Sequence, residues 1–314
     1  MHALRLSSVR GSVAVGLLVA VLGQNANADP AASSDQDWVK SYTVTGRPDV
    51  HVQTGDGSVR VLTSDTQQVE FRIKTTGSAW GFGFGDGPKI ESRQVGNTVE
   101  LNVHVHHMVM GFSNRHTEIE VRMPRSADVQ LQTGDGSIDV AAVDGNVQAH
   151  TSDGRVSVSQ VTGKVDVSSS DGAIEARTLK GTLKLSTSNG SIRATDLDGG
   201  CDASSSDGSV TVEGRFDHLN VSSSDGSVTT RVAAGSSMTS GWQVSTSDGS
   251  VEVALPADFK ANLDLSTNDG HITLNLPVQV EGEVTKSHIR GTLNGGGSSF
   301  RIHSSDGSVR LGSI

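Results

Sequence analysis

Residues 151–174 read TSDGRVSVSQVTGKVDVSSSDGAI, and this stretch decides the fold. A Ser/Thr-x-Asp/Asn-Gly tetrad stands near each end, and it recurs every eighteen residues from Asp135 to Asp225. A fixed period of this length is typical of stacked repeats in which each repeat is one supersecondary unit. The sequence therefore predicts a repeat array before it says anything about chemistry.

Each repeat carries two short stretches in which apolar and polar residues alternate. One stretch includes Val156 and Val158, and the other includes Val165 and Val167. A period of two places such side chains on one face of a β-strand. A glycine ten residues after the column residue, Gly163 in this repeat and Gly145, Gly181 and Gly199 in others, predicts a second turn that divides the coil into two nine-residue halves.

We therefore expect an all-β fold, a right-handed parallel β-solenoid flattened into two sheets with eighteen residues per coil. Because a single coil buries few apolar side chains, the repeats should form one cooperative array instead of separate domains. Aromatic residues make up only 4% of the chain, which agrees with the thin core of such an array.

The first 28 residues have the pattern of a secretory signal peptide. Arg5 and Arg10 precede an apolar run over residues 13–22, and a small-residue cleavage site precedes Asp29. Its removal takes the formal charge from −10 to −12, which disfavours nucleic acid as a partner. No cysteine directly follows the apolar run, and no later segment is long enough to span a bilayer. We expect an exported periplasmic or extracellular protein that is not a lipoprotein and has no transmembrane segment in the mature chain.

The spacing of the Asp-Gly turn signature divides the mature chain into three regions. Residues 29–37 form a short polar linker, residues 38–126 an N-terminal β cap region of longer strands and loops, and residues 127–314 the regular β-solenoid with its C-terminal coils. Cap and solenoid are expected to form one continuous domain. The chain ends inside a coil, so the last edge should be covered by a neighbouring segment or a partner, or be left open for an edge-mediated oligomer.

Two polar patterns are candidate metal sites. The column from Asp135 to Asp225 predicts either a calcium ladder or, more simply, turns in which each Asp bonds its own corner before a left-handed glycine. His104 and His106 share a strand face and would bind zinc or copper only with a third ligand from elsewhere; the alternative is two solvent-facing histidines. Neither pattern completes a ligand set, so we predict no cofactor.

The best candidate for an interaction site is a pair of apolar loops. Aromatic residues alternate with glycine in one loop and methionines lead to a phenylalanine in the other; the residues are Trp80, Phe82, Phe84, Met108, Met110 and Phe112. If neighbouring strands bring the loops together, they form either an exposed contact patch or a hydrophobic cap over the first coil.

Two further features have simpler alternatives. The outward face of the coils is rich in hydroxyl and amide groups, which suits glycan binding, but it has the composition of an inert solvated face as well. Cys201, the only cysteine, occupies an inward position and is expected to be a buried thiol without a basic neighbour.

A family resemblance rests on an ordered set of motifs. These are the bend at Pro124 before Thr133-Gly-Asp-Gly-Ser-Ile138, the serial Ser-Ser-Asp-Gly repeats, and Leu293-Asn-Gly-Gly-Gly before Phe300. Over residues 42–311 the chain resembles the bacterial putative-adhesin family of β-strand repeats, a domain of unknown function related to the GIN domain called an auto-transporter adhesin head. The resemblance implies a secreted β-solenoid of adhesin-like shape, with no established catalytic or binding residues. Some similar proteins are associated with cell-envelope stress systems.

We predict a non-catalytic protein with an adhesin-like role in surface or protein contact, whose partner is an envelope protein or a surface glycan. One alternative is a cell-envelope stress sensor or regulator. A second is a glycan-active β-helix enzyme, which the lack of catalytic motifs and of long loops on the regular coils disfavours.

Overall fold

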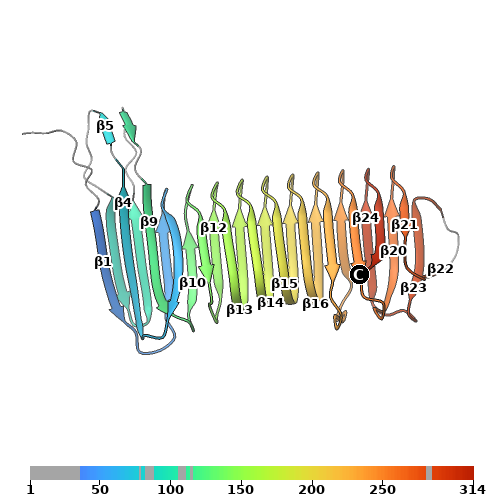
Figure 1. Cartoon of the computed structure of the whole chain (residues 1–314), viewed down its shortest axis with the longest axis horizontal. Coiled ribbons are helices and arrows are strands. Elements are labelled where there is room, and N and C mark those ends of the chain that lie inside the picture. The colour runs from blue at the N-terminus through green and yellow to red at the C-terminus, as the bar shows by residue number, and fades with distance from the viewer. Residues whose placement is uncertain (1–35, 78, 82–87, 105–110, 114–115, 281–284) are drawn as a thin grey trace, which may run out of the picture. The chain divides into compact units, whose positions relative to one another are not determined.

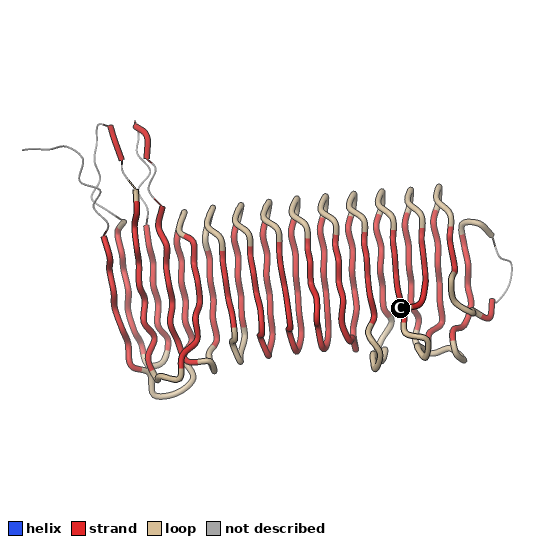
Figure 2. Tube along the Cα trace, in the orientation of Figure 1, coloured by secondary structure: helices blue, strands red, loops and turns tan. Residues whose placement is uncertain are grey.

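The computed structural model describes residues 36–77, 79–81, 88–104, 111–113, 116–280 and 285–314. The expected signal peptide, residues 1–28, lies outside the described residues. Residues 34–314 form one compact unit. The described part of the chain consists of β-strands and turns without a helix, so the all-β expectation is confirmed (Figures 1 and 2).

The centre of the unit is built from long strands stacked in parallel. Strand β13 pairs with β14 from Val156↔Ile174 through to Ser169↔Thr187, with partners eighteen positions apart. Strands β14, β15 and β16 continue the stack. The strands of this region are β10 (Asp128–Gln132), β11 (Ile138–Ala141), β12 (Val147–Thr151), β13 (Val156–Ser169), β14 (Ile174–Thr187), β15 (Ile192–Ser205), β16 (Val210–Ser223) and β17 (Val228–Val232).

Between β11 and β12 the strand breaks around Gly145 as expected, but β13, β14 and β15 continue through the second glycine, which corrects the prediction of two separate strands in those coils. The bends at Gly163 and Gly181 pair with each other, and their neighbours Val161 and Leu179 do too, so the strand ladder continues around the corner. The left-handed residue of each bend is not the glycine alone, because Gln160 has φ 54° and Thr178 has φ 55°. Stacking against the next coil holds a conformation that local propensity alone disfavours.

At the N-terminal end the chain does not stack in sequence order. Strand β2 lies between β7 and β10, and β3 lies between β9 and β11, all in parallel. Antiparallel pairs β1–β4, β4–β9 and β6–β7 complete this end. The strands are β1 (Gln36–Thr43), β2 (Asp49–Thr54), β3 (Ser58–Ser64), β4 (Gln68–Thr76), β5 (Ala79–Gly81), β6 (Lys89–Val95), β7 (Thr98–His104), β8 (Gly111–Ser113) and β9 (His116–Pro124).

The C-terminal segment fills a slot inside the array. Strand β24 lies between β18 and β20, and β25 lies between β19 and β21. Strand β23 then turns back antiparallel beside β20, and β22 pairs with β23. A neighbouring segment therefore covers the edges of the final strands. The strands are β18 (Trp242–Thr246), β19 (Val251–Leu255), β20 (Ala261–Thr267), β21 (Ile272–Leu274), β22 (Gln279–Val280), β23 (His288–Leu293), β24 (Ser299–Ser304) and β25 (Val309–Ser313).

A thin core runs between the two ladders of each coil. Predicted inward residues such as Val156, Ile174 and Leu183 are at most 1% exposed. Near the C-terminal slot the core widens around Trp242, whose ring centroid lies 5.7 Å from that of Phe300. Burial of such large rings contributes more per residue than the valine ladder does, and here it ties the inserted β24 to β18.

Candidate functional site

The Asp-Gly corners are held by a buried hydroxyl, and this corrects the expected turn chemistry. Thr151 Oγ1 donates toward the carbonyl oxygens of Gly134 and Gly136, at 2.9 and 3.0 Å, and accepts from the Gly154 N–H at 3.2 Å. Ser169, Thr187, Ser205 and Ser223 repeat the pattern. Each hydroxyl therefore joins two coils.

The corner glycines are required by close stacking and not by a left-handed backbone. The glycines that follow the aspartates are absent from the residues with positive φ. A Cβ added at Gly172 would lie 1.8 Å from the carbonyl oxygen of Gly154 in the coil below. The predicted left-handed glycine was wrong because tertiary packing, not local turn geometry, excludes a side chain here.

The aspartates of this column are exposed and lie in register. Loss of hydration at the corner, with the carboxylates of Asp135 and Asp171, raises the pKa of Asp153. Asn189 interrupts the column and donates a hydrogen bond to Asp171. Among the residues that the structure describes, no group of three or more His, Cys, Asp or Glu side chains is placed to hold a metal ion.

The two candidate histidines are only partly described. His104 ends β7 opposite Lys89 of β6 and is exposed, whereas His106 lies outside the described residues. Cys201 is fully buried, and loss of hydration raises the pKa of its thiol to about 12. A thiol with so high a pKa is a poor nucleophile at neutral pH.

The two apolar loops are joined by a short ribbon. Strands β5 and β8 pair antiparallel with Trp80 opposite Phe112, beyond the ends of β4 and β9 (Figure 1). Phe82, Phe84, Met108 and Met110 lie outside the described residues. The backbone pairing thus brings residues 79–81 and 111–113 together.

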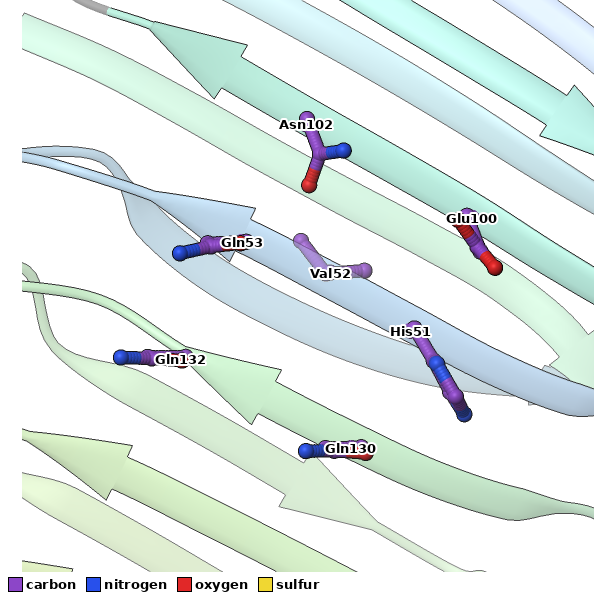
Figure 3. A pocket seen from close by; sticks show the side chains of 7 residues that line it. All are labelled: His51, Val52, Gln53, Glu100, Asn102, Gln130 and Gln132. Carbon is purple, nitrogen blue, oxygen red and sulfur yellow. The ribbon is translucent and has the colours of Figure 1, made fainter.

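A polar groove that sequence reasoning missed lies on β7, β2 and β10. It is an open depression of about 200 Å³, lined by outward polar side chains from the three adjacent strands and by Val52, whose side chain points into the core; the polar residues are His51, Gln53, Glu100, Asn102, Gln130 and Gln132 (Figure 3). The register sets His51 between Glu100 and Gln130, and Gln53 between Asn102 and Gln132. Only the stacking of β2 between β7 and β10 creates this arrangement.

Charged side chains at one end of the groove are already paired. Arg93 Nε lies 2.7 Å from Glu100 and, through that hydrogen bond, holds the pKa of the Glu100 carboxyl below its usual range. His51 Nε2 lies 3.0 Å from the Asp49 carboxylate. The remaining polar residues of the groove are neutral carboxamides, so the site favours hydrogen bonding over charge recognition.

A second unpredicted cluster lies on the same ladder near the C-terminal slot. Asp264 accepts a hydrogen bond from His288 at 3.0 Å, and guanidinium nitrogens of Arg290 and Arg301 lie 3.5 and 3.9 Å from its carboxylate. Loss of hydration by itself would raise the pKa of the Asp264 carboxyl. The hydrogen bond from His288 and the charge of Arg290 outweigh this effect, so the pKa lies below its ordinary value. The cluster joins three strands, since β23 and β24 flank β20.

The family model described as Toastrack DUF4097 matches residues 50–312, which run from β2 to β25. The chain belongs to the Toastrack DUF4097 family. This membership confirms the resemblance to a domain of unknown function that the sequence motifs predicted. No functionally curated protein matches the sequence.

Solved structures give remote likenesses to this Toastrack chain. A putative adhesin from Bacteroides fragilis is 13% identical, with 90% of this chain and 99% of that chain covered and a TM-score of 0.41. A putative adhesin from Parabacteroides distasonis is 10% identical, with 89% and 98% covered and a TM-score of 0.44. A putative lipid binding protein from the same species is 9% identical, with 89% and 98% covered and a TM-score of 0.31. TM-scores below 0.5 give no basis for transferring a ligand.

Proposed function

We propose that this protein is a non-catalytic contact protein of the cell envelope or cell exterior, built as a right-handed array of eighteen-residue coils. Its partner is an envelope protein or a surface glycan, and contact is made through the β5–β8 ribbon. The observation that carries the proposal is the pairing of Trp80 with Phe112, which unites the two apolar loops at one end of the array.

Physical reasons favour this ribbon as a contact edge. Apolar and aromatic residues concentrated in loops beyond a rigid sheet are typical of recognition surfaces, since the scaffold positions them at little entropic cost. The regular coils differ, because their large apolar side chains are in the core. Exposed large hydrophobic residues in the part of the chain that the structure describes are few and scattered; they are Val39, Val95, Val280 and Ile314.

The test is binding of the labelled protein to whole cells of its own species. Deleting residues 78–87 or making W80S/F112S should abolish binding while the β-type circular dichroism spectrum is unchanged. The matched control is V39S/V95S, which removes two exposed apolar side chains from the same end, 52% and 70% exposed. Undiminished binding by both ribbon variants would rule out the ribbon as the contact site.

A further inference from the structure

The amide side chains of the β7–β2–β10 groove have unused hydrogen-bonding capacity. Gln53, Asn102, Gln130 and Gln132 line it, and their carboxamides make no hydrogen bond with any described residue. Each carboxamide offers two N–H donors and an acceptor oxygen. Figure 3 shows the side chains of Gln53 and Gln132 on neighbouring strands with their amide ends pointing the same way.

In the row that contains Gln132, the amides are confined to the groove. Farther along the same ladder, the row that contains Gln132 continues as His150, Ser168, Ser186 and Ser204. None of those side chains carries a carboxamide, and two pairs of them bond to one another, His150 to Ser168 at 2.8 Å and Ser204 to Ser186 at 3.3 Å. This row of the regular coils is therefore partly hydrogen-bonded within itself, whereas the same row in the groove presents unpaired amides around a depression.

The pairing of the charged side chains in the groove indicates which class of ligand it would bind. The Glu100 carboxylate is paired with Arg93, and His51 is paired with Asp49, so no unpaired cation is available to attract an anion. Neutral groups that both donate and accept hydrogen bonds match a lining of carboxamides with an acidic acceptor. Hydroxyl groups of a sugar are such groups, and strand spacing near 4.8 Å with a two-residue rise near 6.6 Å spreads the amides over an area that suits a ring with several hydroxyls.

We propose that the groove formed by β7, β2 and β10 binds a neutral saccharide. Asn102, Gln53, Gln130 and Gln132 donate to and accept from its hydroxyls, and Glu100 accepts from one more. The groove contains no aromatic platform, so a single site binds weakly, with a Kd of roughly 1 mM. This site goes beyond the proposed ribbon contact, and it lies on a different ladder from β4 and β9, which carry the ribbon.

The experiment measures binding of cellohexaose, xylohexaose and mannohexaose to the full mature chain by isothermal titration calorimetry, with polygalacturonate as an anionic probe. The test variant is N102A/Q130A, and the matched control is N220A/Q243A. Asn220 and Gln243 are the same two residue types on the same ladder, away from the groove. Circular dichroism verifies that both variants are folded.

We expect at least one neutral hexasaccharide to bind, the groove variant to weaken that binding about tenfold, and the control to retain it. Equal weakening by both variants would overturn the location, and binding of polygalacturonate alone would overturn the ligand class. Absence of any binding by the wild-type chain would also reject the proposal. The ribbon variant W80S/F112S should bind the saccharide normally, so failure of the ribbon proposal and failure of this one are separate results.

Discussion

Replacing Thr151 by valine tests whether buried hydroxyls hold the coils together. Valine keeps the shape of the side chain but removes the bonds to the carbonyl of Gly136 and from the N–H of Gly154. Thr151 is 0% exposed, so water cannot replace either partner. Leaving a buried polar group unpaired costs about 1–3 kcal/mol. Because Thr151→Val leaves two such groups, it should lower the free energy of unfolding by about 2–6 kcal/mol.

Thr151→Ser is the matched control. Serine keeps the hydroxyl and removes one methyl group, which costs about 0.8 kcal/mol, and Ser169 already occupies the same position in the next coil. Urea unfolding followed by far-ultraviolet circular dichroism gives the global effect. Amide hydrogen exchange at Gly154 gives the local effect and should accelerate only in the valine variant. If both variants destabilise equally, the hydroxyl is not what secures the corner.

Three further outcomes follow from the corner column and the core. Gly172→Ala should destabilise by at least about 3 kcal/mol in urea unfolding, because the new methyl would overlap a backbone carbonyl that cannot retreat without separating two coils; a loss below about 0.5 kcal/mol would contradict the close stacking. Asp153→Asn should be more stable than wild type at pH 7, because a raised folded-state pKa means that the charged form is disfavoured on folding. That advantage should shrink as the pH falls through the folded pKa and vanish below the ordinary aspartate pKa, and a pH-independent difference would contradict the repulsion. Cys201 is fully buried and its thiol pKa is raised to about 12, so it should resist iodoacetamide in the native protein at pH 8 and react fully in 6 M guanidinium. Labelling is measured by mass spectrometry, and rapid labelling of the native protein would show that this part of the array opens.

Repetition made the inward residues and the corners predictable. Each coil stacks on a copy of itself, so a residue such as Leu183 occupies the environment of Val165 and Cys201, and one period read from the chain describes the others. The corner chemistry was harder to predict. In a Ser/Thr-x-Asp-Gly tetrad both the hydroxyl and the carboxylate are able to cap the turn, and only the stacked carbonyls of the coil below favour the hydroxyl.

The candidate sites depended still more on tertiary structure. The groove takes its side chains from β2, β7 and β10, which are distant in sequence, and no periodic pattern links them. The Asp264 cluster likewise requires β24 to enter between β18 and β20. The apolar loops were recognisable from composition, but their union depended on the antiparallel pairing of β4 with β9.

The sequence alone determined the all-β class, the inward ladder of the regular coils and the positions of their glycine corners, because these features depend on side chains spaced one coil apart. Tertiary structure alone decided the order of coils at both ends, where β2 and β3 join the ladders from one side and β24 and β25 enter a slot at the other. The physical reason is that every corner carries nearly the same tetrad. Local chemistry therefore makes many stacking orders equivalent, and only burial of particular bulky residues, such as Trp242 against Phe300, selects one of them.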